Sequence, residues 1–183
     1  MKEKYTRFKD IPQFISNGRY SINVPINALR QTLDSYIKEY GLELNPDFQR
    51  GHVWTEEQQI AFVEYVLSGG RSGREIYLNH TRWSTGEDGW FVLVDGLQRI
   101  TALLRFLNDE IKAFGSYYSE YTDFLRHHVD LIFSINELGT KKEVLEWYIQ
   151  MNRGGTVHSD EEIQKVRRMI EGISEKEKVD SEV

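Results

Sequence analysis

The stretch GWFVLVDGLQRITALLRFLND (residues 89–109) carries the clearest fold signal in the sequence. It opens with an apolar run rich in aromatic and β-branched residues, which is typical of a buried strand. Apolar residues then recur at the spacing of one helix face: Ile100, Leu103, Leu104 and Leu107. Because only Asp95-Gly96 separates the two patterns, the stretch predicts a strand, a tight turn and a helix N-terminus in immediate succession.

The segments on either side extend this unit. EIYLNHTRW (residues 75–83) is a second β-rich run, and a loop of several residues joins it to residues 89–94. The two runs predict a hairpin whose second strand is the more buried. Further along, VDLIFSI (residues 129–135) predicts a strand and TKKEVLEWYIQMN (residues 140–152) a helix. The glycines of NRGGT end that helix, and SDEEIQKVRRMI (residues 159–170) predicts another.

The N-terminal half is also mixed in character. Residues 20–46 have the pattern of a strand, a helix that stops at Gly41, and a second strand that runs extended toward Trp54. Thr55, with Gln58 three residues later, forms a capping-box pattern and predicts the start of another helix. The order of elements predicts an α+β fold: a compact domain with a small mixed sheet flanked by helices.

Length and composition limit the function. At 183 residues and 21.6 kDa the chain has the length of one domain, for which ~100–200 residues is usual. We expect an N-terminal arm over residues 1–19, the domain over 20–170 and a polar C-terminal tail over 171–183. No apolar run approaches the ~20 residues of a membrane helix, and the first residues lack the apolar stretch of a signal peptide. We therefore expect a cytoplasmic protein that does not bind a membrane.

Residue usage excludes further classes. The absence of cysteine excludes disulfides, thiolate nucleophiles and cysteine zinc sites, and the five histidines do not form the H-E-x-x-H pattern of a zinc hydrolase. A net charge of -6 disfavours a broad basic face for nucleic acid, although a local cationic site is compatible with it. Arg71, Arg74 and Arg82, around the predicted hairpin, are the candidates for such a basic cluster.

The turn at Asp95 is the strongest candidate for chemistry. A helix N-terminus that follows a glycine exposes N–H groups whose partial positive charge suits phosphate. Arg99 could add donors to phosphate oxygens, Asp95 could bind Mg²⁺ or act as a base, and Gln98 could orient a ligand or water. The alternative is that Asp95-Gly96 is only a turn and N-cap, with Arg99 a solvated charge.

Two further polar groups could join the same ligand. In NPDFQR (residues 45–50), Gln49 could read a nucleobase edge and Arg50 could bind phosphate or a base, whereas the alternative is a salt bridge that anchors the loop. In MNRGGT (residues 151–156), Arg153 and Thr156 could donate to phosphate or ribose, whereas the alternative is a helix C-cap. His52 could contact a phosphate. The tryptophans are interpreted as packing residues: Trp54, Trp83, Trp90 and Trp147.

These three groups together resemble the ParB/sulfiredoxin superfamily, and specifically the N-terminal domain of GmrSD-type modification-dependent restriction systems. That family has a Gln-Arg pair before a tryptophan, as in residues 45–54 here. It also has an Asp-Gly-Gln-Gln-Arg motif before an apolar helix, as in residues 95–103, and a late Asn-x-Gly-Gly-Thr element, as in residues 152–156. The three motifs occur in the family's order and span about residues 20–170.

The resemblance implies a pocket for a nucleoside triphosphate (NTP), in which the Asp95 turn holds the phosphates with Mg²⁺. The implied catalytic residues are Asp95, Gln98 and Arg99, with Asp95 also the metal ligand. The implied nucleotide-binding residues are Gln49, Arg50, Gly96, Arg99, Asn152, Arg153, Gly154 and Thr156. Leu97 replaces the family's first glutamine, so the chain could bind nucleotide and turn it over poorly.

We therefore expect Mg²⁺-dependent NTP binding and hydrolysis in a standalone domain linked to phage defence or counter-defence. The resemblance also implies possible partners: modified DNA, a separately encoded nuclease or defence protein, or a second copy in a homodimer. The alternative function is a non-catalytic module of the same fold that binds nucleic acid or protein. A self-sufficient nuclease is disfavoured, because no clustered histidines or carboxylates accompany Asp95.

Overall fold

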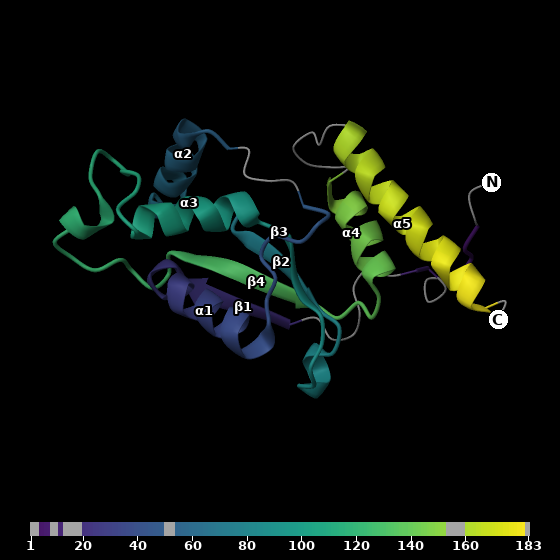
Figure 1. Ribbon diagram of the computed structural model, residues 1–183. Helices are drawn as coiled ribbons and strands as arrows, with labels where there is room; N and C mark the ends of the chain where they lie inside the picture. The colour runs from purple at the N-terminus through teal and green to yellow at the C-terminus, as the bar shows by residue number, and fades with distance from the viewer. Residues whose placement is uncertain (1–3, 8–10, 13–19, 50–53, 153–159, 182–183) are drawn as a thin grey trace.

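The computed structural model describes residues 4–7, 11–12, 20–49, 54–152 and 160–181 (Figure 1). Its strands are β1 (Tyr20–Pro25), β2 (Glu75–His80), β3 (Phe91–Asp95) and β4 (Asp130–Asn136). Its α-helices are α1 (Leu29–Tyr40), α2 (Glu56–Leu67), α3 (Leu97–Leu107), α4 (Lys141–Asn152) and α5 (Asp160–Ser181). Three short 3₁₀ helices complete the described part: η2 (Ile26–Ala28), η3 (Trp83–Thr85) and η4 (Tyr118–Glu120). None of the described helices is long and apolar enough to cross a membrane.

The strands form one mixed sheet in the order β1-β4-β2-β3. β1 pairs antiparallel with β4, β4 runs parallel to β2, and β2 and β3 form the predicted antiparallel hairpin. Between Tyr77 and Leu78 the register shifts, so that Tyr77 lies opposite Asp95 at the end of β3. The sheet and its flanking helices confirm the predicted compact α+β domain.

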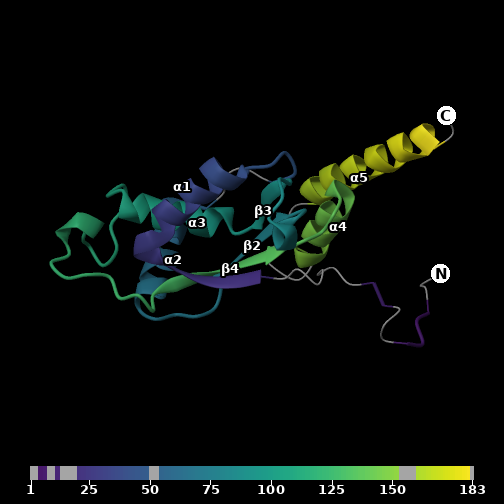
Figure 2. The same ribbon diagram turned by 90° about the horizontal axis from the view of Figure 1, so that it is seen from below.

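Two apolar clusters cover opposite faces of β3, because alternate residues of a strand point to opposite sides. Phe91 and Leu93 belong to a core shared with α1, α2 and α3, whereas Val92 and Val94 pack with α4 and α5. Figures 1 and 2 show α4 and α5 side by side at one end of the molecule, with the C-terminal part of α5 extending away from it. All four tryptophans pack against these clusters, as predicted.

Local sequence signals account for several element boundaries. Thr55 accepts the Gln58 amide and the Gln58 side chain accepts the Thr55 amide, so the predicted capping box begins α2. Gly41 ends α1 in the left-handed conformation, with φ of 67°.

Two predicted boundaries differ from the structure. The second strand expected before residue 46 is reduced to a single bridge between Glu43 and Val92. The helix predicted over residues 159–170 continues to Ser181, so the residues expected to form a polar tail are largely helical.

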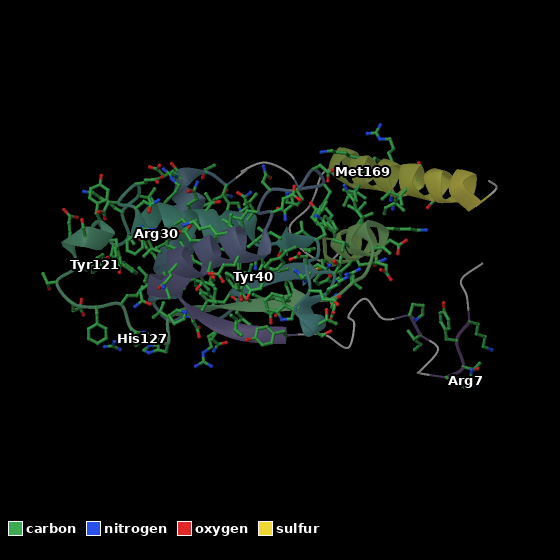
Figure 3. All side chains as sticks on the ribbon, turned by 60° about the horizontal axis from the view of Figure 1, so that its bottom comes forward. Arg7, Arg30, Tyr40, Tyr121, His127 and Met169 are labelled. Atoms are coloured by element: carbon green, nitrogen blue, oxygen red, sulfur yellow. The ribbon has the colours of Figure 1, made fainter. Side chains whose placement is uncertain are left out.

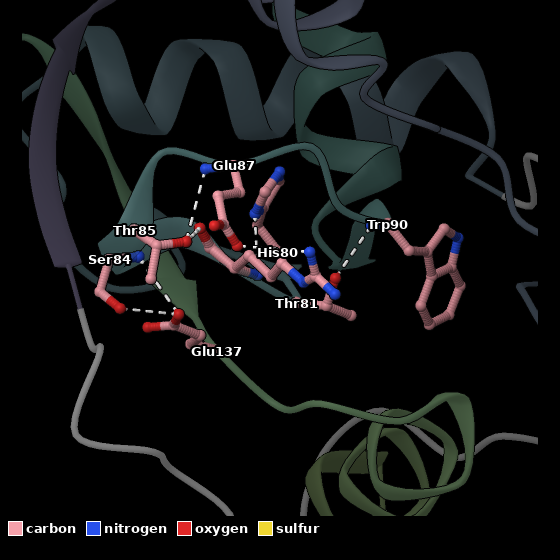
Figure 4. Close-up of polar contacts among 8 residues, drawn as sticks. His80, Thr81, Ser84, Thr85, Glu87, Trp90 and Glu137 are labelled. Carbon is pink, nitrogen blue, oxygen red and sulfur yellow. Dashed lines mark hydrogen bonds and ion pairs between the residues drawn. The ribbon is translucent and has the colours of Figure 1, made fainter.

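Side chains hold the loop between β2 and β3 (Figure 4). The Trp90 amide donates to the Thr81 hydroxyl over 3.0 Å, and the Arg82 amide donates to Nδ1 of His80 over 3.2 Å. Glu137, just after β4, accepts from both the amide and the hydroxyl of Ser84. The hairpin loop is thus hydrogen-bonded to the residue that follows β4.

Two of the three arginines that were candidates for a basic cluster, Arg74 and Arg82, each pair with a carboxylate. Arg74 is buried, pairs with Asp130 over 3.1 Å, and donates to the Val66 carbonyl at the end of α2. Arg82 pairs with Glu87 in the loop. Arg74 is a structural residue because these acceptors offset the free-energy cost of burying its charge.

Candidate functional site

Gly96 makes the turn from β3 into α3 possible. Its φ is 117°, and a Cβ atom there would lie 2.5 Å from Cδ1 of Ile76. Only glycine meets both conditions without strain. No side chain of the described residues caps α3, and its first turn holds no acidic residue. The predicted helix N-terminus is therefore present at the end of a buried strand, with the partial positive charge that favours an anion.

Asp95 and Arg99 form an ion pair within this turn. The other Arg99 nitrogen, Nη1, donates to the Glu75 carbonyl over 2.6 Å and to the Gly73 carbonyl over 3.3 Å. The Arg99 side chain is only 17% exposed, so its interpretation as a solvated charge is wrong. In this conformation Arg99 fastens the start of β2 to the Asp95 turn, and we call this set of contacts the Arg99 latch.

The structure brings two of the predicted glutamines to the same strand and turn. Gln98 accepts the Trp54 amide through Oε1 over 3.1 Å, and Gln49 donates through Nε2 to the Leu93 carbonyl over 2.7 Å. Both contacts join the segment before α2 to β3 and α3, residues more than 40 positions apart in the chain. Gln49 and Trp54 thus contact β3 and the first turn of α3, and their sharing of one ligand with the Asp95 turn stays a prediction.

The remaining predicted ligand residues are not placed. Arg50, His52, Arg153, Gly154 and Thr156 lie outside the described residues. Asn152 is described only as the last residue of α4. Their assignment to a nucleotide site stays a prediction.

Sequence reasoning missed two residues beside the turn. Tyr77 lies opposite Asp95 in the sheet and donates its hydroxyl to the Glu75 carboxylate. Burial, followed by the Glu75 contact, raises the pKa of Tyr77 to about 12, so the phenol is neutral at physiological pH. The signal was the spacing of Glu75 and Tyr77, which places both on one face of the strand that pairs with Asp95.

The residues at the turn fit a magnesium ion that arrives with phosphates. Mg²⁺ is commonly held by one or two carboxylates, with water and phosphate oxygens completing its shell. Asp95 offers one such carboxylate. Among the described residues no group of three or more acidic, histidine or cysteine side chains could hold a metal ion alone. Asp95 would thus supply one carboxylate to an ion whose shell is completed by water and phosphate oxygens.

Comparison with known proteins places the chain in a family. One solved structure to which it is similar is the C-terminally truncated chromosome-partitioning protein ParB from Caulobacter crescentus, complexed with CTP-gamma-S. The two are 19% identical with a TM-score of 0.41, and the match covers 76% of this chain but only 56% of that one. No curated protein matches. The family model of the GmrSD restriction endonuclease N-terminal domain matches residues 29–169, most of the sequence, and the chain therefore belongs to that family.

Proposed function

We propose that this domain binds an NTP together with Mg²⁺ at the Asp95 turn and hydrolyses it. The observation that carries the proposal is the α3 N-terminus, which no described side chain caps, with Asp95 and Arg99 beside it. Backbone N–H groups, a carboxylate for the metal and a guanidinium are the parts that phosphoryl transfer uses for positioning and charge neutralisation.

Each residue then has a defined role. The first N–H groups of α3 would hold phosphate oxygens, and Arg99 would turn from Asp95 to the phosphates as Asp95 takes the metal. Bound Mg²⁺ would supply charge neutralisation. Gln98 lies in the first turn of α3 and would orient the attacking water.

The test is to incubate the purified protein with ATP, GTP, CTP and UTP plus Mg²⁺ and to resolve the products chromatographically. The Asp95→Asn variant should bind and turn over nucleotide far more weakly than wild type. Asp34→Asn, which changes an exposed carboxylate paired with Lys38 on α1, is the matched control and should behave as wild type. Equal turnover by wild type and Asp95→Asn would remove Asp95 from the mechanism.

The second candidate is a module that binds nucleotide, nucleic acid or protein without turnover. The observation that favours it is Leu97, which stands where the family motif has glutamine and packs against the core instead of offering a polar group. Nucleotide binding measured by calorimetry, without product formation, would support this candidate over hydrolysis. A gel-shift assay with modified and plain DNA tests its nucleic-acid version.

A further inference from the structure

A cavity lies at the far end of α3 from the Asp95 turn. It has a volume of about 410 Å³, within the roughly 300–1,000 Å³ that is usual for small-molecule sites. Its walls come from the ends of α2 and α3 and from the segment between α3 and β4. Its lining includes four aromatic residues and three charged or polar ones: Phe106, Phe114, Tyr121 and Phe124, and Asp123, Arg126 and His128.

This cavity is remote from the helices at the other end of the fold. Figure 3 shows Tyr121 and His127 at the opposite end of the molecule from Met169 of α5. With a helical rise of about 1.5 Å per residue, Phe106 lies roughly 14 Å along α3 from its first residue. A ligand in this cavity would therefore not touch the Asp95 turn.

The cavity displays aromatic rings to solvent. Phe124 is 76% exposed and Phe114 60%, the highest values among the large hydrophobic side chains that the structure describes. Tyr121 is also exposed, whereas Phe106 is buried at the end of α3. Tyr121 and Phe106 meet nearly edge to face, with ring centroids 6.2 Å apart. Exposed aromatic surface that gathers around one hollow marks a binding site more often than scattered apolar residues do.

The backbone that presents Phe114 is strained and firmly held. Phe114 has a φ of +50°, a conformation that bulky residues rarely adopt. Its amide donates to the Glu64 carboxylate over 2.7 Å, and the Tyr121 hydroxyl donates to the Ala113 carbonyl over 2.7 Å. Ala113 and Ser116 also exchange two backbone hydrogen bonds. These contacts hold the backbone that carries the exposed Phe114 ring, which lowers the entropy cost of ordering this segment when a ligand binds against it.

Polar groups at the cavity include both donors and an acceptor. Arg126 and His128 can donate hydrogen bonds, and Asp123 can accept them. A flat heteroaromatic ring whose edge carries N–H groups beside carbonyl or ring-nitrogen acceptors can pair with these donors and this acceptor. The faces of such a ring can stack on the aromatic walls. We propose that the cavity between α2, α3 and residues 113–129 binds a planar heteroaromatic ring of the nucleobase class.

The experiment uses uncharged nucleosides, which lack the phosphates that the proposed site at the Asp95 turn would bind. Adenosine, guanosine, cytidine and thymidine are titrated against the full chain and followed by saturation-transfer-difference NMR, with cyclohexanecarboxamide as a non-aromatic probe. At least one nucleoside should bind, and cyclohexanecarboxamide should not. Phe124→Ala should weaken the binding at least tenfold, and Arg126→Gln should weaken it while leaving ring stacking in place.

Two variants serve as controls. Tyr40→Ala removes another exposed aromatic ring, on α1, and should leave nucleoside binding unchanged. Asp95→Asn should also leave it unchanged, so failure of the nucleotide site and failure of this cavity are distinguishable. Thermal unfolding of Phe124→Ala is measured alongside and should match wild type, because the ring that is removed is exposed. Absence of binding by all four nucleosides, or binding that Phe124→Ala leaves intact, would overturn the proposal.

Discussion

Replacing Gly96 with alanine tests whether the turn into α3 requires glycine at this position. A positive φ costs a non-glycine residue about 1–2 kcal/mol, and the new Cβ would lie 2.5 Å from Cδ1 of Ile76, which is fully buried. Forcing an extra carbon into a packed site costs about 1–3 kcal/mol. Together these terms predict that Gly96→Ala lowers the free energy of unfolding by about 2–5 kcal/mol.

Urea unfolding followed by circular dichroism measures this change, with the dependence on urea concentration checked to be the same in both proteins. The steric part can be separated by Ile76→Val, which deletes Cδ1 and by itself costs about 0.5–1.5 kcal/mol. The double variant lacks the atom that clashes. Its loss of unfolding free energy should therefore be smaller than the sum of the two single losses by at least about 1 kcal/mol.

Gly172→Ala is the matched control, because Gly172 lies within α5 and a Cβ there meets no atom within 4 Å. It should stabilise the protein by up to about 1 kcal/mol, since alanine favours a helix over glycine. Wild-type stability of Gly96→Ala would contradict a need for glycine at this turn. A double variant whose loss of unfolding free energy equals the sum of the two single losses within about 0.5 kcal/mol would contradict the clash with Ile76.

Three further predictions concern other parts of the molecule. Leu97→Gln restores the family motif and should raise NTP turnover over wild type; an unchanged rate would show that Leu97 does not limit hydrolysis. Arg74→Met leaves Asp130 without its buried partner and should lower the unfolding free energy by about 3 kcal/mol, measured in urea against wild type. Burial lowers the pKa of His80 below 6.5, outweighing Glu137 and Asp88, so the unfolded chain binds the proton more readily. Stability should therefore fall as the pH drops through 6.5, and His80→Gln should flatten that slope in urea titrations from pH 5 to 8.

The sequence predicted best those elements that are determined by residues close together in the chain. The β3–α3 unit follows from an apolar run, one glycine and a helical stripe within 19 residues, and the capping box of α2 from two residues three positions apart. Val144, Leu145, Tyr148 and Ile149 are buried in α4 as their spacing predicts. Each of these signals depends on periodicity or capping along the chain.

Two of the errors concern residues whose partners are distant in sequence. The segment before α2 looked like a strand, but Glu43 makes only one bridge and Gln49 fastens the chain to Leu93 with its side chain. Arg74 was interpreted as a possible surface cation because Asp130 lies 56 residues away. Spacing cannot show such pairs, since tertiary folding decides which polar group becomes buried and which acceptor it meets.

The Arg99 latch has a thermodynamic consequence for any phosphate ligand of the turn. A phosphate that takes the guanidinium competes with Asp95 and with the carbonyls of Gly73 and Glu75. The observed association constant is then the intrinsic constant multiplied by the fraction of molecules in which Arg99 is released. By reciprocity, ligand binding would loosen the chain entering β2, so amide hydrogen exchange around Gly73 would increase as the turn becomes occupied. The segment before β2 would thereby report occupancy of a site that it does not itself form.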